Sequence, residues 1–469
     1  MKAQREHLLK VGVSGIRGVV GPFLTPQIAR AFAQAFGTYV GAGRVVVGRD
    51  TRSSGPMLQH AVHCGLVAAG CEVIDVDILP TPTIQLFTGA IGARGGLAIT
   101  ASHNPPEYNA LKMFNSAGLF FNTYERGELL DIYNQGVFHE AVNAEMRPVR
   151  HEHEAPARMH LARVVRLVNL ERIRARKFRV ALDAVNGACA ALAPQFLHDV
   201  LGCELHAISI DPMQPFPRIA EPRPDTLGDL SNLVRAHNCD IGFGLDPDGD
   251  RLAVADETGR VLDNDDVLTV AVDAVLSRVK PGAAALGPVV VNLTTTAAID
   301  EIAKKYGVAV HRSAVGEANV VEMMLATSAV VGGEGGNGGV IFPAVQLCRD
   351  AFAGMALWLD RLAAPPAKVS ELIAALPRYY RRSTSMPFPQ NQVAPLIRQV
   401  KALWPHAKLD SRDGLKLVLP ESWIHVRPSN TEPVLRLAVE SKEEAGADAL
   451  LSALGEAARA LAPSETREG

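Results

Sequence analysis

The sequence predicts an α/β protein with three related α/β domains, each with a mixed sheet, and a smaller C-terminal α+β domain around a central cleft. Three observations predict this fold class. The chain has 469 residues, which is too long for one hydrophobic core and favours three or four domains. A strand–loop–helix–strand–helix–strand pattern occurs three times along it. After about Pro377 this pattern gives way to antiparallel strands and a closing helix.

The repeated pattern is defined by its apolar strands. The first strands are expected at 44–47, 178–182 and 288–292, the second at 71–76, 203–210 and 308–311, and the third at 97–99, 240–244 and 329–331. Each second strand follows a helical stretch and a glycine, and each third strand runs into a polar or glycine-rich loop. Open α/β sheets place reactive groups beyond the carboxyl ends of their strands, so we expect these loops to converge on one cleft.

Breaks in the pattern give the expected domain boundaries. Domain 1 covers 1–150, domain 2 covers 155–255, domain 3 covers 256–370 and domain 4 covers 377–469. The stretch 148–154 is charged and aperiodic and is expected to be a linker, and 256–259 is expected to form a hairpin turn. In domain 4, segments 416–419 and 423–426 are typical of antiparallel strands and 444–461 of an amphipathic helix.

Composition excludes several classes of protein. The formal net charge of −3 argues against a nucleic-acid partner, although a local basic pocket for a small anion remains compatible with it. The N-terminus lacks the apolar segment of a signal peptide, and no apolar run is long enough to span a membrane. The cysteines form no CxxC pair and lie in apolar surroundings, so we expect buried reduced thiols and a cytoplasmic protein. They are Cys64, Cys71, Cys189, Cys203, Cys239 and Cys348.

The loop after the third strand of domain 1 carries a candidate nucleophile, Ser102. Its sequence is Thr-Ala-Ser-His-Asn-Pro-Pro over 100–106, and the two prolines forbid an immediate helix. Ser102 is therefore expected on a rigid loop beyond a strand. A serine that only caps or turns the chain is the alternative.

The equivalent loop of domain 2 contains Asp246, Asp248 and Asp250 at alternate positions, followed by Arg251. Three carboxylates that turn toward one centre are hard oxygen ligands and favour Mg²⁺. An EF-hand is the first alternative, since Glu257 falls at its twelfth position, but Arg251 occupies the position that needs glycine. A solvated acidic turn is the second alternative.

The loop of domain 3, residues 332–339, is glycine-rich and contains G-x-G-x-x-G. A dinucleotide fingerprint should open a helix, whereas 340–342 is typical of a strand. Close approach of the backbone to a sugar, with Glu334 accepting hydrogen bonds from its hydroxyl groups, is the preferred interpretation. A flexible hairpin stays open as the alternative.

Basic side chains complete the set of candidates. Residues 427–433 combine Arg427 with hydroxyl groups and free amides between two prolines, which suits either a phosphate cradle or a plain turn. Arg17 lies between glycines and could face the cleft, while Asp50 and Arg52 are expected to fix a loop through a salt bridge. Lys112 lies on an apolar strand, where a role in the cleft and snorkelling to solvent are both open.

These loops together resemble the α-D-phosphohexomutase superfamily over nearly the whole chain, on the strength of Thr-Ala-Ser-His-Asn-Pro at 100–105, the loop 246–251 and the loop 427–433. The resemblance implies a phosphoserine at Ser102 and Mg²⁺ held by Ser102, Asp246, Asp248 and Asp250. It places Arg17, His103, Lys112 and Arg251 with Ser102 in the catalytic set. It also implies sugar binding by Glu334 and Asn337 and phosphate binding by Arg427, Ser429, Asn430 and Thr431.

The function implied by this resemblance is transfer of a phosphoryl group between O6 and O1 of a hexose phosphate, through phosphoserine and a sugar bisphosphate, by a monomer or homodimer. Residues 105–109 and the Gly-Gly-Asn-Gly-Gly segment after Glu334 resemble the archaeal-type phosphoglucosamine mutase branch. Departures from the wider pattern are Val13 for threonine, Asn430 for glycine and the lack of Ser and His after Glu334. Mannose or glucose phosphate is the alternative substrate, and a phosphatase and a non-catalytic sugar-phosphate-binding protein are the alternatives of a different class.

Overall fold

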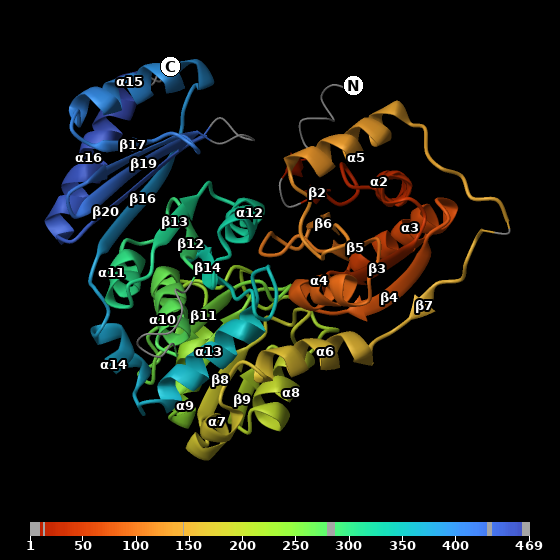
Figure 1. Ribbon diagram of the computed structural model, residues 1–469, viewed down its shortest axis with the longest axis horizontal. Helices are drawn as coiled ribbons and strands as arrows, with labels where there is room; N and C mark the ends of the chain where they lie inside the picture. Colours follow the sequence, from red (N-terminus) through yellow and green to blue (C-terminus); the bar gives the residue numbers. More distant parts are fainter. Residues whose placement is uncertain (1–9, 13–14, 144, 279–286, 429–433, 462–469) are drawn as a thin grey trace, which may run out of the picture.

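A computed structural model describes residues 10–12, 15–143, 145–278, 287–428 and 434–461 of the chain (Figure 1). Their strands form four sheets of seven, four, four and five strands, and each sheet uses one continuous portion of the sequence. The first three sheets mix parallel and antiparallel pairs and the fourth is antiparallel, which confirms the predicted fold class.

The first sheet has the strand order β1-β2-β6-β5-β3-β4-β7. The strands are β1 (Lys10–Gly12), β2 (Gly15–Val19), β3 (Arg44–Arg49), β4 (Glu72–Ile78), β5 (Gly95–Ile99), β6 (Tyr108–Phe114) and β7 (Arg150–His151). The helices are α2 (Pro26–Val40), α3 (Gly55–Ala68), α4 (Thr81–Ala90) and α5 (Thr123–Gln135). Val45 and Val47 face a core built with α2 and α3, while Val46 faces one built with α4, so helices cover both faces of the sheet.

The second and third sheets have the orders β11-β10-β8-β9 and β13-β12-β14-β15. The second contains β8 (Arg179–Asp183), β9 (Glu204–Ile208), β10 (Ile241–Leu245) and β11 (Leu252–Ala255), with α6 (Glu154–Val165), α7 (Leu170–Arg176), α8 (Leu192–Gln195), the π-helix η1 (Phe196–Val200) and α9 (Gly228–His237). The third contains β12 (Val289–Asn292), β13 (Val310–Ser313), β14 (Val331–Glu334) and β15 (Gly339–Ile341), with α10 (Asn264–Leu276), α11 (Ala298–Lys305), α12 (Glu317–Thr327), the 3₁₀ helix η2 (Gly335–Asn337), α13 (Ala351–Ala363) and α14 (Val369–Ala374).

These two sheets share one continuous apolar core. Phe196 of η1 and Phe352 of α13 lie edge to face with centroids 5.5 Å apart, and Phe243 of β10 and Val291 of β12 belong to the same cluster. Burial of this much apolar surface between the two sheets fixes their relative position.

The fourth sheet has the order β16-β20-β19-β18-β17. Its strands are β16 (Tyr380–Pro387), β17 (Lys408–Asp410), β18 (Leu415–Leu419), β19 (Ser422–Pro428) and β20 (Val434–Ser441). With it lie the 3₁₀ helix η3 (Gln390–Gln392), α15 (Val393–Leu403) and the predicted closing helix α16 (Glu444–Leu461). In Figure 1 this sheet and its helices form a separate lobe beside β13 and α11.

The threefold repeat is confirmed. The first strand of each unit (β3, β8, β12) pairs in parallel with both the second (β4, β9, β13) and the third (β5, β10, β14). Each third strand then turns back into an antiparallel partner, β6, β11 or β15. The three predicted chemical loops are therefore equivalent turns at the same end of three related sheets.

One expectation was wrong and another needs a structural detail added. The stretch 148–154, expected to be a linker, contains the two-residue strand β7, which pairs with β4, and reaches the first residue of α6, Glu154. An exposed two-residue edge strand needs no apolar alternation, so its sequence gives no strand signal. Cys64 is exposed on α3, whereas the other five cysteines are buried, and all six are free thiols.

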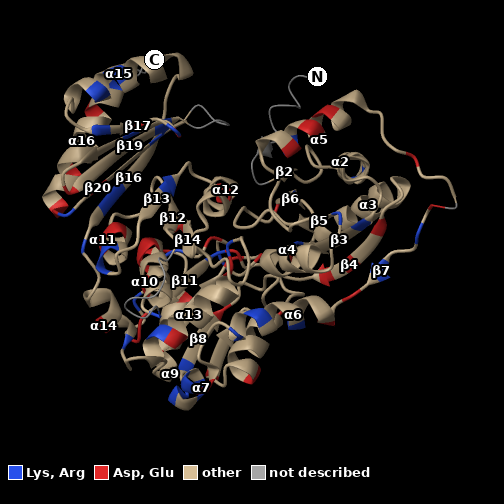
Figure 2. Ribbon diagram, in the orientation of Figure 1, with Lys and Arg blue, Asp and Glu red and all other residues tan. Residues whose placement is uncertain are grey.

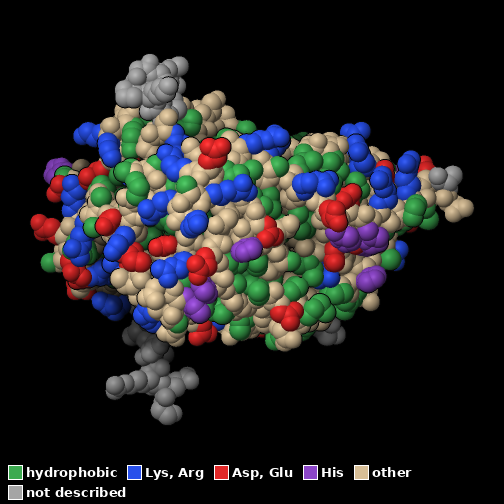
Figure 3. All heavy atoms as spheres, turned by 90° about the horizontal axis from the view of Figure 1, so that it is seen from below, with side chains coloured by type: hydrophobic (Ala, Val, Ile, Leu, Met, Phe, Trp, Pro, Cys, Tyr) green, Lys and Arg blue, Asp and Glu red, His purple; other side chains and the backbone are tan. Residues whose placement is uncertain are grey.

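The surface agrees with the small net charge. On the face shown in Figure 3, basic and acidic side chains are interspersed. No described helix has both the length and the apolar character required to cross a membrane.

Candidate active site

The chemical loops open into one cavity of about 480 Å³ at the centre of the molecule. Figure 2 shows acidic and basic segments meeting there, between α4 and β14. The predicted residues that line the cavity are Arg17, Ser102, His103, Lys112, Arg251, Glu334 and Asn337. Four segments that are distant in sequence thus supply one site.

Ser102 follows β5 on a loop whose backbone is tightly held. Its φ is 51°, a left-handed conformation that costs free energy for a residue other than glycine. Arg52 is bonded to Asp50, as predicted, with Nε 3.0 Å from Oδ2, and donates to the carbonyl of Ser102 at 2.6 Å. The same guanidinium also donates to the carbonyls of Asn104 and Pro105. These bonds stabilise the loop and direct the Ser102 side chain at the next loop.

The Ser102 hydroxyl donates to Asp246 Oδ2 at 2.8 Å, and both residues are buried. This contact joins the first and second sheets. The serine is placed against the acidic triad rather than toward solvent.

The acidic triad presents one oxygen from each carboxylate. Asp246 Oδ1 accepts from the amides of Asp250 and Arg251, and Asp248 Oδ2 accepts from Thr81 Oγ1 at 2.7 Å. The opposite oxygens, Asp248 Oδ1 and Asp250 Oδ1, are buried and have no hydrogen-bond partner among the described residues. Ligand oxygens of all three aspartates lie within 4.8 Å of one another. Buried, unpartnered, hard oxygens fit a divalent cation.

The charges of the triad are strongly coupled. Burial and the neighbouring Asp250 and Asp248 raise the pKa of Asp246 well above its usual value. Burial also acts to raise the pKa of Asp248, but Lys112, with Nζ 2.6 Å from Asp248 Oδ2, lowers it overall. Three carboxylates in one buried site are costly without further positive charge, and a metal ion would supply it.

Lys112 of β6 does not snorkel to solvent. It is 1% exposed and its ammonium also lies 3.5 Å from Asp250 Oδ2. Burial acts to lower its pKa, but Asp248 and Asp250 raise it overall, so Lys112 is a cation beside the triad.

Three further side chains lie around Ser102. His103 Nδ1 is 3.5 Å from Ser102 Oγ, and burial, together with Arg251 and Arg17, lowers the pKa of His103 to about 3. Arg17 donates to Asn104 Oδ1 at 2.5 Å, and Arg251 pairs with Glu221 at 2.5 Å. His103 is neutral near pH 7, while the two arginines bring positive charge to the cavity.

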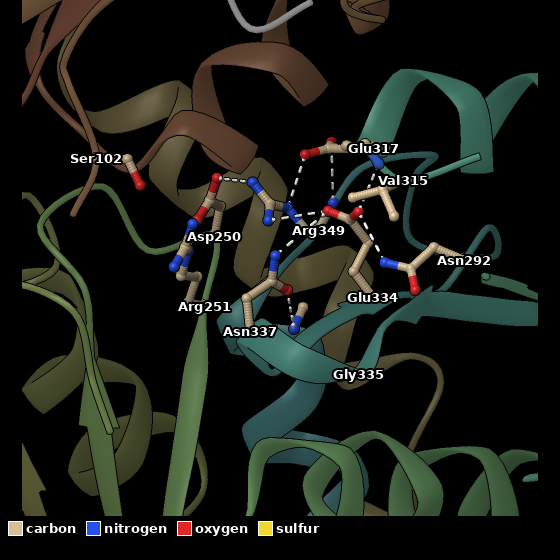
Figure 4. A network of polar contacts seen from close by, with 12 residues as sticks. Ser102, Asp250, Arg251, Asn292, Val315, Glu317, Glu334, Gly335, Asn337 and Arg349 are labelled. Carbon is tan, nitrogen blue, oxygen red and sulfur yellow. Dashed lines mark hydrogen bonds and ion pairs between the residues drawn. The ribbon is translucent and has the colours of Figure 1, made fainter. Parts of the chain in front are cut away.

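Glu334 ends β14 and is the centre of a polar network (Figure 4). Its Oε1 accepts from Asn292 Nδ2 at 3.0 Å and from the Gly316 amide at 2.8 Å. Its Oε2 has longer contacts, 3.3 Å to Arg349 Nη1 and 3.4 Å to Asn337 Nδ2. Oε2 is therefore the oxygen better able to accept a bond from a ligand.

The glycine-rich segment around Glu334 is neither a dinucleotide fingerprint nor a loose hairpin. It forms the short helix η2 and continues into the strand β15. A Cβ on Gly335 would lie 1.9 Å from Asp265 Oδ1, so the glycine is required by close packing. The loop is fixed in place by its neighbours.

The C-terminal lobe reaches the same region. Arg427 of β19 binds Asp413 Oδ1 through Nε at 2.8 Å, and Asp413 Oδ2 accepts from the Val315 amide at 3.1 Å. Arg427 is not among the residues that line the cavity, but Arg381 and Arg436 of the same lobe are. Ser429, Asn430 and Thr431 lie outside the described residues.

The sequence motifs missed Arg349, Arg381 and Arg436. Arg436 lies directly opposite Arg427 in the β19–β20 pair, and Arg381 pairs with Asp265. A single arginine in a strand of alternating polar and apolar residues resembles an ordinary surface position. Only the pairing of the strands in the folded structure shows that such a residue lines the cavity.

Comparison with known proteins matches four stretches, which together cover most of the chain, to the domains of one family. Residues 8–140, 158–259 and 263–380 match alpha/beta/alpha domains I, II and III of phosphoglucomutase/phosphomannomutase, and residues 367–456 match its C-terminal domain.

Individual relatives span almost the full length. The chain is 36% identical to "Phosphoglucomutase/phosphomannomutase" of Thermococcus kodakarensis over 92% of this chain and 94% of that protein. It is 35% identical to "Probable phosphoglucosamine mutase" of Methanopyrus kandleri, with the same coverage. A crystal structure of a phosphoglucomutase/phosphomannomutase family protein from Burkholderia thailandensis superposes with a TM-score of 0.82 at 27% identity, covering 97% of this chain and 99% of that one.

Proposed function

This chain belongs to the phosphoglucomutase/phosphomannomutase family of phosphotransferase isomerases, and we propose that it moves a phosphoryl group between O6 and O1 of a hexose phosphate through a phosphorylated Ser102. The observation that carries this proposal is the 2.8 Å contact between Asp246 and the hydroxyl group of Ser102, a residue that lines the shared cavity. A phosphoryl group on Ser102 Oγ would lie between the acidic triad and the space available to a sugar.

Two matched transfers complete the isomerisation. In the first, the bond from phosphorus to Ser102 Oγ breaks, a bond to the free sugar hydroxyl forms, and the proton of that hydroxyl passes to a base in the cavity. The product is a sugar bisphosphate. In the second, the other phosphoryl group returns to Ser102, and its sugar oxygen regains a proton.

The catalytic side chains proposed with Ser102 are those that line the cavity around it, namely Arg17, His103, Lys112 and Arg251. His103 is neutral and is the proposed proton acceptor, whereas the two arginines and Lys112 supply positive charge. Positioning and charge neutralisation do most of the work in phosphoryl transfer, and these side chains concentrate positive charge where the phosphoryl group would move.

A divalent metal, proposed to be Mg²⁺, would be held by Asp246, Asp248 and Asp250 together with an oxygen on Ser102. When bound, it would neutralise charge on the transferring group. The protein's contribution is to hold one oxygen of each of two carboxylates: Thr81 and Lys112 donate to Asp248 Oδ2, and Arg349 donates to Asp250 Oδ2. The other oxygen of each carboxylate is then left for the metal.

The sugar and the phosphate that is not being transferred are proposed to bind to two further loops, 332–339 and 427–433. We propose that Glu334 Oε2 and the Asn337 amide bind sugar hydroxyl groups, because they line the cavity and make only long contacts with each other. Arg427, with Ser429, Asn430 and Thr431, is proposed to hold the phosphate that is not being transferred. The bisphosphate must turn around between the two transfers, so this cradle has to accept two orientations of the sugar.

Glucosamine 6-phosphate is the proposed substrate and glucosamine 1-phosphate the product. The name of the Methanopyrus kandleri relative and the Gly-Gly-Asn-Gly-Gly segment after Glu334 support it. The Thermococcus kodakarensis relative, of nearly equal identity, carries the other name, so mannose or glucose phosphate is the second candidate.

The test is isomerisation of glucosamine, mannose and glucose 6-phosphates, each primed with its 1,6-bisphosphate and Mg²⁺. We expect the highest kcat/KM for glucosamine phosphate. A higher value for mannose or glucose phosphate would establish the second candidate. Stoichiometric phosphate release would identify a phosphatase, and no turnover of any primed sugar would identify a sugar-phosphate-binding protein.

A further inference from the structure

Arg349 pairs with three carboxylates that come from different elements, namely the triad loop, the start of α12 and the end of β14 (Figure 4). Its Nη2 is 2.6 Å from Asp250 Oδ2, its Nε 2.8 Å from Glu317 Oε2 and its Nη1 3.3 Å from Glu334 Oε2. Burial acts to lower the pKa of Arg349, but these three carboxylates raise it well above its usual value. One buried cation therefore joins the acidic triad to the glycine-rich loop 332–339, which contains Glu334 and is called the sugar loop below.

The backbone around Arg349 is fixed from both sides. An isolated bridge pairs Arg349 with Ile341 of β15, just beyond the sugar loop. Two residues later, the Ala351 amide donates to the Gly249 carbonyl of the triad loop at 3.1 Å. Between them, Asp350 caps α13 and accepts from His160 at 2.8 Å. The guanidinium is thus held at a set position between the two loops.

Arg349 occupies one oxygen of Asp250. Asp250 Oδ2 is bonded to Arg349 and approached by Lys112, while Asp250 Oδ1 has no hydrogen-bond partner among the described residues and lies 3.8 Å from Arg251 Nε. A charge-assisted bond on one oxygen orients the carboxylate and leaves the other for a metal.

A different nitrogen of the same guanidinium, Nη1, contacts Glu334 Oε2, the oxygen proposed to bind the sugar. That contact, at 3.3 Å, is longer than the 2.6 Å contact to Asp250. The guanidinium is planar and rigid, so a movement of Glu334 toward a sugar hydroxyl shifts the balance of both contacts.

We propose that Arg349 is a positioning residue that couples the metal-binding triad to the sugar loop, so that the state of Glu334 changes the affinity of the triad for a divalent cation. This inference rests on the proposed function for the meaning of the sugar loop, but the coupling itself involves only Asp250, Arg349 and Glu334. Thermodynamic linkage makes the effect reciprocal: metal bound at the triad changes how Glu334 binds its ligand.

A double-mutant cycle on metal affinity tests the coupling without any sugar phosphate. The Kd for Mn²⁺ is measured by calorimetric titration for the unmodified protein, Glu334→Gln, Arg349→Lys and the double variant. Arg349→Lys keeps the positive charge but loses the planar guanidinium that bonds to several carboxylates at once. Because Asp250 is then less firmly oriented, we expect about 10-fold weaker Mn²⁺ binding. Glu334→Gln is expected to weaken binding about 3-fold alone and to have no effect in the Arg349→Lys background.

Two further variants complete the design. Arg361→Lys on α13, the helix that follows Arg349, is the control, because Arg361 Nε pairs with Asp273 at 2.8 Å and the residue does not line the cavity. It is expected to leave Mn²⁺ affinity unchanged. If Arg349→Lys does not fold, Glu317→Gln, which loosens Arg349 without touching the triad, is expected to weaken Mn²⁺ binding about 3-fold.

Unchanged Mn²⁺ affinity in Arg349→Lys would overturn the proposal, as would an equal effect of Glu334→Gln in both backgrounds. If Arg349→Lys does not fold, unchanged Mn²⁺ affinity in Glu317→Gln would overturn the proposal instead. The three-sugar assay is independent of these titrations, so failure of the proposed activity and failure of the coupling are distinguishable.

Discussion

Ser102 combines the chemical and the conformational features expected of a reactive residue. Its hydroxyl contacts the acidic triad, and its backbone is held in a left-handed conformation by the bonds of Arg52. Strain of this kind persists only where surrounding contacts impose it. The proposed role of the residue therefore rests on the rigid loop as much as on the hydroxyl.

Replacing Ser102 by glycine separates these two features. Ser102→Gly removes the hydroxyl and relieves the backbone strain, so we expect isomerase turnover to fall below detection while the midpoint of urea unfolding is unchanged or higher. Ser328 at the end of α12 also has a positive φ, 53°, and is exposed, so Ser328→Gly is a matched control that should retain full turnover. Retained activity in Ser102→Gly would refute the assignment.

Lys416 of β18 makes stability depend on pH. It is 2% exposed, has no ion pair among the described residues, donates to the Leu293 carbonyl and lies 4.5 Å from the Trp423 ring centroid. Burial, with repulsion from Arg312, lowers the pKa of Lys416 to about 6. Between about pH 6 and the unfolded pKa near 10, the unfolded chain binds the additional proton, so the free energy of unfolding rises with pH.

Urea denaturation at pH 6.5 and 8.5 measures this effect. We expect the unmodified protein to gain about 2–3 kcal/mol over this range relative to Lys416→Met, which has no group to titrate. Equal pH dependence of the two proteins would show that Lys416 is charged in the folded state.

At the scale of elements, the three repeated units were the most predictable part of the structure. Their strands contain runs of buried β-branched residues, such as the valines 45–47 in β3 and 289–291 in β12, so local pattern and burial agree. The loops that carry Ser102, the acidic triad and Glu334 were located because each begins where the third strand of a unit ends.

The parts that could not be predicted depend on tertiary contacts. Strand β7 is recognised only by its pairing with β4, and the pairing of Arg427 with Asp413 depends on the hairpin between β18 and β19. Arg349 belongs to no sequence motif, and only the folded structure shows that three carboxylates distant in sequence surround it.

The triad loop requires glycine at one position. Gly249 has φ +71°, and a Cβ there would lie 2.4 Å from Cys189 Sγ. We expect Gly249→Ala to lower the free energy of unfolding by about 1–3 kcal/mol and to weaken Mn²⁺ binding, because the loop must shift.

A glycine in open space provides the control. Gly127 lies within α5 with no atom near its missing Cβ, so Gly127→Ala should stabilise the protein by up to about 1 kcal/mol and leave Mn²⁺ affinity unchanged. Equal stability changes in the two variants would contradict this account of the loop.

At the scale of the whole molecule, the domains are joined in two different ways. The second and third sheets share an apolar core, whereas the C-terminal lobe has its own core. That lobe meets the third sheet through polar contacts, such as Asp413 with the Val315 amide and Glu440 with the Ala297 amide. Val315 precedes Gly316, which binds Glu334, so the C-terminal lobe contacts the loop that supports the proposed sugar site.

Arg427 belongs to this interface, and its removal tests whether the lobe binds substrate. We expect Arg427→Ala to raise KM for the sugar phosphate about 10-fold or more through loss of a charged hydrogen bond, with a smaller change in kcat. Arg382→Ala, in the same lobe but paired with Glu444 and Asp448, is the control and should leave KM unchanged. An unchanged KM in Arg427→Ala would count against the phosphate cradle.

The whole account depends on a phosphoryl group that resides on Ser102 and moves from there to the sugar. The most direct measurement is to incubate the protein with Mg²⁺ and a hexose 1,6-bisphosphate labelled with ³²P, locate the label by peptide mapping, and chase it with unlabelled hexose 6-phosphate. We predict label on the peptide that contains Ser102 and its complete transfer to the sugar during the chase. Label at another residue, or label on Ser102 that does not return to sugar, would contradict the account.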